Sequence, residues 1–169
     1  MRAYADGVLT STDTPALHIC VTPEFAYRGS FSFDLDAVAR VERHIFVDSA
    51  DALIRRLIVV HFESFLPGVD DLYRYTLTDE RVLGGESYGR SVSALSVSDD
   101  RAAAPGAEMA RTDEYLTAAG LVLPDRHVVA RYARIVGADR RAELLIFYHE
   151  CPGIEHGILA RADAAFEIT

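Results

Sequence analysis

The chain has 169 residues, of which 50% are hydrophobic, and a formal net charge of -9 at pH 7. This length suits one domain with a real core, and the hydrophobic content argues against disorder. The acidic balance argues against DNA, RNA or an anionic membrane as the main partner, since these need clustered basic side chains. We therefore expect residues 1–169 to form a single domain whose partner is a small hydrophobic or anionic molecule.

All 17 basic residues are arginine, and the sequence contains no Lys, Asn, Gln or Trp. Without lysine the chain cannot form a Schiff base, which excludes aldolase-type and pyridoxal chemistry. Cys20 and Cys151 are too few for a disulfide framework, so we expect free thiols, with a long-range bridge as the alternative. The first residues lack the apolar region of a signal peptide, and no apolar run reaches transmembrane length, which predicts a cytoplasmic location.

The first third of the chain predicts strands after an irregular start. Residues 1–15 are small and polar, and we expect them to form an irregular lead-in. Alternation of apolar and polar residues predicts strands over 16–22 and 25–34. Gly29 marks a bulge or a sharp bend in the second of these strands. The aromatic residues expected on one face of that strand are Phe25, Tyr27, Phe31 and Phe33.

Three hairpins are predicted next, because three pairs of β-rich runs are each joined by a short polar turn. The strands of these hairpins cover 38–48 with 52–65, 72–77 with 81–97, and 126–136 with 141–150.

Two helices complete the predicted elements. The first lies near 106–119, where Gly120 suits the C-terminal cap. The second lies near 154–167, with Pro152 in its first turn. The predicted fold class is mainly β (β or α+β), an antiparallel meander that closes into a barrel or a strongly curved sheet. A calycin-like barrel is an analogy of architecture, and it implies no function.

Metal-site motifs are incomplete in this sequence. Neither an H-E-x-x-H motif nor a paired C-x-x-C motif occurs. His61 with Glu63, and His149 with Cys151, each place two ligands on one strand face, which is half of a site. We expect no metal and no other cofactor.

Several apolar strand faces are interrupted by an arginine. A symmetric turn at 48–51 would place Arg43 opposite Arg56, where two like charges need a counter-ion. Arg90 and Arg131 interrupt the apolar faces of two later strands in the same way. Arginine suits bidentate recognition of an anion. We therefore predict an interior that binds an apolar molecule with a carboxylate or phosphate group. The predicted ligand-binding residues are Arg43, Arg56, Arg90, Arg131 and Tyr88.

A structural interpretation of these arginines stays open. Glu86, Glu143 or Glu150 would pair with them in a purely structural network. The side on which each arginine lies also depends on hairpin register, and a slip of one residue would turn the side chains to the other face.

Proton transfer has two candidate sites. A symmetric turn at 137–140 would pair His127 with Glu150, and a histidine beside a carboxylate can move protons near neutral pH. Tyr148 would line the same interior, so the predicted catalytic residues are His127, Glu150 and Tyr148. His61 and Glu63, two residues apart on one strand face, are the second candidates. A strand-end salt bridge is the structural alternative.

Three functional hypotheses follow from the sequence. The first is a small-molecule barrel that acts as a cyclase, isomerase or dehydratase on an apolar acid. The second is a non-catalytic carrier for a hydrophobic acid or a haem-like ligand. The third is a structural or oligomerisation domain with a filled core, for which a homodimer would be expected. The sequence identifies neither the ligand nor the reaction.

Overall fold

A four-stranded antiparallel sheet contains both ends of the chain. A computed structural model describes residues 1–103, 108–152 and 154–169. The sheet has the order β1-β2-β3-β11, with β1 (Arg2–Ala5), β2 (Val8–Ser11), β3 (Leu17–Val21) and β11 (Phe166–Ile168). The predicted strand over 16–22 is confirmed. The predicted irregular lead-in over 1–15 is wrong, because Asp6 and Gly7 both adopt positive φ and turn β1 back onto β2 as a tight hairpin.

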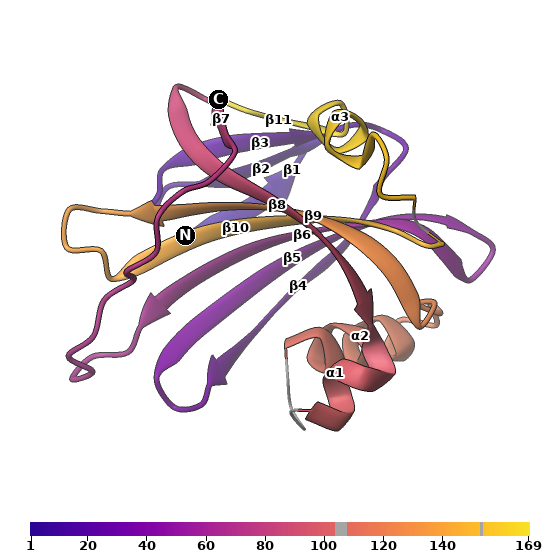
Figure 1. The fold of residues 1–169 in the computed structure, drawn as a ribbon, viewed down its shortest axis with the longest axis horizontal. Helices are drawn as coiled ribbons and strands as arrows, with labels where there is room; N and C mark the ends of the chain where they lie inside the picture. The colour runs from indigo at the N-terminus through magenta and orange to yellow at the C-terminus, as the bar shows by residue number, and fades with distance from the viewer. Residues whose placement is uncertain (104–107, 153) are drawn as a thin grey trace.

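A second sheet has seven antiparallel strands and is strongly twisted (Figure 1). Its order is β4-β5-β6-β10-β9-β8-β7. The strands are β4 (Ala26–Leu35), β5 (Ala39–Ala50), β6 (Leu53–Phe65), β7 (Glu80–Leu83), β8 (Glu86–Ser96), β9 (Arg126–Val136) and β10 (Ala142–Glu150). The mainly β, antiparallel prediction is confirmed. In the described part of the chain, β4 and β7 remain the two edges of an open sheet, so a closed, calycin-like barrel is not confirmed.

The seven-stranded sheet is covered on both faces. On the sheet-covered face, residues such as Phe46 and Ile58 pack against the four-stranded sheet and α3 (Ile158–Asp163). On the helix-covered face, Ile45 and Leu57 pack with residues of α1 (Val97–Ala103) and α2 (Glu108–Ala118) (Figure 1). Because both faces are covered, the middle residues of β5 (43–48) and of β6 (57–62) are continuously buried rather than alternating.

Double burial explains why the predicted register of the first hairpin is wrong. The turn is centred on Asp51 and Ala52, and a bulge follows Asp48, so Arg43 lies opposite His61. Arg56 lies beside Asp48 on the other face. A strand whose two faces are equally apolar does not fix its own register by alternation.

The other two hairpins also differ from prediction. β9 and β10 pair one residue away from the predicted register, so Arg131 lies opposite Phe147 and Glu150 opposite Val128. The residues predicted as a strand over 72–77 form neither helix nor strand, and β8 instead pairs with β7 around the glycines at 84–85.

The predicted irregularity at Gly29 is confirmed. The register of β4 against β5 shifts between Tyr27 and Gly29, which is a β-bulge. The bulge rotates the strand, so Tyr27 packs on Phe46 at 5.1 Å between ring centroids, whereas Phe31 stacks on Tyr115 of α2 at 4.6 Å. The prediction that the aromatic residues of this segment share one face is therefore wrong. Tyr27 is on the sheet-covered face, and Phe31 is on the helix-covered face.

The helices are shorter than predicted. The prediction of a helix over 106–119 is confirmed by α2 from Glu108 onwards, and residues 106–107 lie outside the described residues. The predicted helix over 154–167 is confined to α3, because the chain then enters β11. Among the described residues, no helix combines the length and the apolar character needed to cross a membrane.

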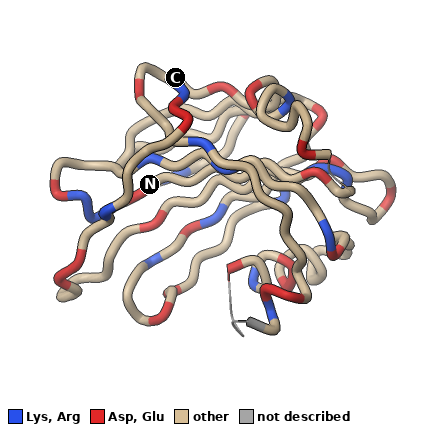
Figure 2. The backbone as a smooth tube through the Cα atoms, in the orientation of Figure 1, with Lys and Arg blue, Asp and Glu red and all other residues tan. Residues whose placement is uncertain are grey.

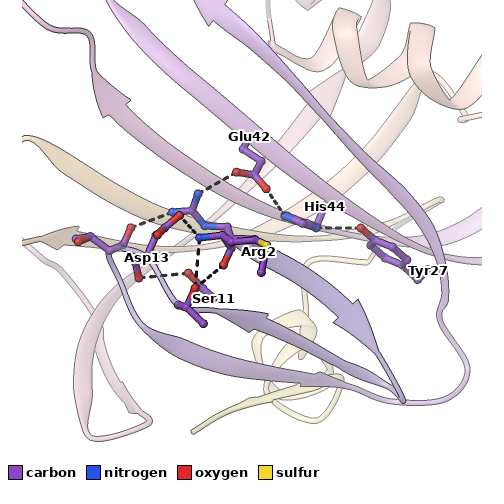
Figure 3. A network of polar contacts seen from close by, with 9 residues as sticks. Arg2, Ser11, Asp13, Tyr27, Glu42 and His44 are labelled. Carbon is purple, nitrogen blue, oxygen red and sulfur yellow. Dashed lines mark hydrogen bonds and ion pairs between the residues drawn. The ribbon is translucent and has the colours of Figure 1, made fainter.

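A polar network joins the two sheets (Figure 3). Arg2 of β1 donates to Glu42 of β5 at 2.9 Å, and His44 Nε2 lies 2.8 Å from the same carboxylate. Burial lowers the pKa of His44, so we assign a neutral ring that donates from Nε2 and accepts the Tyr27 hydroxyl at Nδ1, 3.0 Å away. The network therefore links β1 to β4 and β5 without an unpaired buried charge.

Gly84 and Gly85, in the turn between β7 and β8, differ in their contact with β11 of the four-stranded sheet. Gly84 and Gly85 both have positive φ, but a Cβ on Gly84 would lie 3.0 Å from the Ile168 carbonyl oxygen, whereas one on Gly85 would meet nothing within 4 Å. We expect Gly85→Ala to lower the free energy of unfolding by about 1 kcal/mol through backbone strain alone. Gly84→Ala should lower it by about 2 kcal/mol or more, because β11 must also move. Equal losses in urea denaturation would contradict this contact.

Candidate functional site

A cavity of about 480 Å³ lies between the helix-covered face of the sheet and the helix pair α1–α2. This volume is within the range of small-molecule sites. Its apolar lining comes from both the sheet and α2: Leu35, Val59, Leu95, Met109, Val129 and Phe147. Its polar lining consists of Asp36, Arg43, Ser93, Asp100, Glu108, Arg131 and His149. Two of the arginines predicted from sequence, Arg43 and Arg131, thus line one cavity.

The Arg43 side chain is buried, and each of its three nitrogens is bonded to another protein group. Its Nε donates to His61 Nδ1 at 3.1 Å, and one terminal nitrogen donates to the Glu108 carbonyl and the Thr112 hydroxyl, both at 2.6 Å. The other terminal nitrogen forms an ion pair with the Glu108 carboxylate. Arg43 therefore attaches the first turn of α2 to the sheet, and little of its donor capacity remains for a ligand.

A chain of hydrogen bonds continues from Arg43 along the sheet. His61, which is fully buried, accepts from Arg43 at Nδ1, so its proton lies on Nε2 and is donated to Glu63 at 2.9 Å. Tyr73 donates to the other oxygen of Glu63 at 2.6 Å. Burial alone would raise the pKa of Glu63, but these two hydrogen bonds and the nearby charge of Arg43 together leave the pKa below its usual value.

Glu143 and Glu63 form a pair of buried carboxyl groups. They are directly opposite each other on β10 and β6, where two negative charges would repel. Burial first, and the charge of Glu63 second, raise the pKa of Glu143 to about 7. A hydrogen bond from Tyr75 at 3.0 Å and the charge of Arg131 act in the opposite direction. The pair therefore holds one charge at mildly acidic pH.

Arg131 differs from Arg43 because its guanidinium is not committed. Within the described residues it makes no hydrogen bond and no ion pair, and its guanidinium carbon lies 6.0 Å from the centroid of the Tyr75 ring. Three interstrand spacings separate β9 from β5, which places Arg131 roughly 14 Å from Arg43 along the sheet. Arg131 is thus a cation in the cavity wall that is available to an anion.

His149 lies diagonally across the ladder from Arg131, because Phe147 is the residue directly opposite Arg131. Its ring packs edge-on against His127 at 4.9 Å between centroids, and both side chains are buried. Burial lowers the pKa of His149 well below its usual value, and the neighbouring His127 and Arg43 lower it further. His149 is therefore neutral at physiological pH.

Three of the predicted ligand-binding residues lie on the sheet-covered face and outside the cavity. Arg56 donates to Asp48 at 2.7 Å and covers the ring of Phe25. Arg90 pairs with Asp79 and Asp163. Tyr88 belongs to the core between the two sheets. The structural interpretation therefore holds for Arg56 and Arg90, although their counter-ions are aspartates that the sequence did not suggest.

The predicted proton-transfer residues are divided between two faces. Tyr148 donates to Glu150 at 2.9 Å on the sheet-covered face, where Glu150 also accepts from Arg161. His127 is buried on the helix-covered face beside His149 and lines a separate surface hollow with Arg126. The one-residue change in register removes the predicted opposition of His127 and Glu150. The second pair, His61 and Glu63, is in direct contact, as its spacing suggested.

Several residues of this site carried no recognisable sequence signal. Glu108 is 65 positions from Arg43, and Tyr73 and Tyr75 belong to a segment that was predicted as a strand. His149 was noted as half of a metal site with Cys151. In the described ranges no group of three or more His, Cys, Asp or Glu is arranged to bind a metal, and both cysteines are free thiols.

Comparisons with protein-family models, with curated proteins and with solved structures found no match to this chain. The functional interpretation therefore rests on the geometry of the cavity.

The carboxyl pair predicts a pH dependence of stability. The folded-state pKa of Glu143, about 7, lies above its unfolded value of 4.5, so the protonated group stabilises the fold below pH 4.5 and this contribution is lost as the pH rises through 7. Glu143→Gln should therefore raise the free energy of unfolding at pH 8 by up to about 3 kcal/mol, and change it little at pH 4.

The matched variant is Glu63→Gln, which removes the carboxylate that His61 and Tyr73 stabilise. It should lower the free energy of unfolding at pH 8 in the same urea titrations. If the two variants gave the same pH profile, the assignment of the charge to Glu63 would be wrong.

Proposed function

We propose that the protein binds an apolar small molecule with a carboxylate group in the cavity beneath α1 and α2, and that Arg131 holds the carboxylate. The observation that carries this proposal is the uncommitted guanidinium of Arg131 in the wall of a mainly apolar cavity. A half-buried cation without an ion-pair partner is costly, and an anionic ligand would supply one.

The acidic residues of the cavity do not compete for Arg131. Glu108 is paired with Arg43, Asp100 lies on α1, and Asp36 is exposed at the turn between β4 and β5. These acids therefore lie toward α1, α2 and the β4 edge, whereas Arg131 lies on β9. Figure 2 shows the charged residues along the backbone, with acidic residues at several hairpin tips, on the helices and also within strands. An elongated ligand with its anionic end at β9 fits this distribution.

A binding or carrier role is favoured over a cyclase, isomerase or dehydratase. His127, Tyr148 and Glu150 do not share the cavity, so the acid–base group expected from the sequence is not available to a ligand there. The cavity also argues against the alternative of a domain with a filled core. Cytoplasmic location and single-domain organisation stay predictions.

Isothermal titration with dodecanoate tests the proposal. Wild-type protein should bind dodecanoate more tightly than the uncharged dodecanol, because only the carboxylate can pair with Arg131. Arg131→Met should weaken dodecanoate binding by about 1.5–3 kcal/mol, which is roughly ten- to a hundredfold. Dodecanol binding should change little, because methionine preserves the apolar part of the side chain.

Arg126→Met is the matched control, since Arg126 begins the same strand but is exposed. It should leave both affinities unchanged. The proposal is refuted if wild-type protein binds neither compound, or if the preference for dodecanoate survives in Arg131→Met.

A further inference from the structure

His149 is a polar group that the proposed carboxylate site does not use. It is 2% exposed and lines the cavity, yet it makes no hydrogen bond to any described residue. Its Nδ1 is closed off from open space, so Nε2 is the ring nitrogen that a molecule in the cavity can reach. A buried polar group without a partner is unfavourable, and a ligand that supplies the partner would offset this cost.

The surroundings of His149 determine which kind of group it can bind. Phe147 lies beside its ring, His127 packs on it edge-on, and the nearby charge that acts on it is the cation Arg43. All three disfavour a protonated imidazole, so a second carboxylate on the ligand would find no positive charge here. A neutral imidazole donates from one nitrogen and accepts at the other. A hydroxyl group can pair with Nε2 in either tautomer, because it both donates and accepts.

We propose that the ligand is a hydroxylated apolar carboxylic acid, whose carboxylate pairs with Arg131 and whose hydroxyl pairs with Nε2 of His149. This inference rests on the proposed function and specifies its ligand class. The two side chains originate from diagonal positions on adjacent strands, with Cα atoms roughly 7–8 Å apart. The Arg131 side chain extends further toward Tyr75, away from His149, so the hydroxyl is several carbons removed from the carboxylate.

Binding of a hydroxylated series tests this inference. The probes are dodecanoate and dodecanoates that carry one hydroxyl at successive positions along the chain. In wild-type protein, at least one hydroxylated isomer should bind about tenfold more tightly than dodecanoate, as expected for one added hydrogen bond to a buried group. In His149→Phe this preference should disappear, while binding of dodecanoate itself changes little.

His156→Phe is the control, because His156 is exposed and the substitution is the same. It should retain the wild-type preference. The inference is overturned if every isomer binds wild-type protein no more tightly than dodecanoate, or if His149→Phe keeps the preference. Failure of wild-type protein to bind any acid would instead overturn the proposed function, and this inference with it.

A second measurement covers the case in which His149→Phe does not fold. The imidazole nitrogen resonances of His149 in wild-type protein should shift at Nε2 when the preferred hydroxylated isomer is added. Dodecanoate should leave that resonance near its unliganded position. An Nε2 resonance that responds equally to both probes would overturn the assignment of the hydroxyl to His149.

Discussion

The guanidinium of Arg43 connects the large sheet to α2, and the candidate site depends on this connection. Arg43 reaches the carboxylate and carbonyl of Glu108 and the hydroxyl of Thr112 from the middle of β5. A buried charge of this kind is tolerated because its donors are satisfied, and removal of one partner from such a pair costs about 3–5 kcal/mol. With α2 fixed in this way, the space beneath it becomes a cavity with walls on two sides.

The two arginines of the cavity therefore have different tasks. Arg43 is bonded to other protein groups. Its hydrogen-bond network continues through His61 to Glu63, which is directly opposite Glu143. Arg131 is on β9, which β6 and β10 separate from β5 in the sheet. Its donors are not used by described protein groups and are available to a ligand. The opposite face of the same sheet packs against the four-stranded sheet, and the cavity that both arginines line is on the helix-covered face.

Local features of the fold could be predicted from the sequence, whereas the pairing of strands could not. The bulge at Gly29, the strand over 16–22 and the core of α2 all follow from residue type or periodicity within a few positions. The hairpin registers do not, because the middle of β5 and of β6 is buried on both faces, and alternation therefore does not single out one inner face. The tight turn at Asp6 and Gly7 has a sequence signal, an Asp-Gly pair, which predicts a hairpin more specifically than the small polar residues around it predict an irregular segment.

In the candidate site, too, local features could be predicted from the sequence, whereas long-range contacts could not. Arg43 and Arg131 stand out in the sequence as arginines within apolar runs, and in the structure both line the cavity, Arg43 buried and Arg131 half-buried. Their roles depend on residues that are distant in sequence. Glu108 pairs with Arg43, whereas in the described part of the chain no acidic group forms an ion pair or a hydrogen bond with Arg131. Arg56 and Arg90 gave the same sequence pattern but face the other way, where Asp48 and Asp163 neutralise them.

Hydrogen exchange of α2 tests the central claim most directly. In wild-type protein, the backbone amides of Glu108–Ala118 should be protected as strongly as those of the strands beneath them. Arg43→Met should abolish most of that protection while the four-stranded sheet keeps its own, because α2 loses its attachment and the sheet pairing does not. Arg40→Met, an exposed arginine on the same strand, is the control and should leave α2 protected. Unchanged protection of α2 in Arg43→Met would contradict the account.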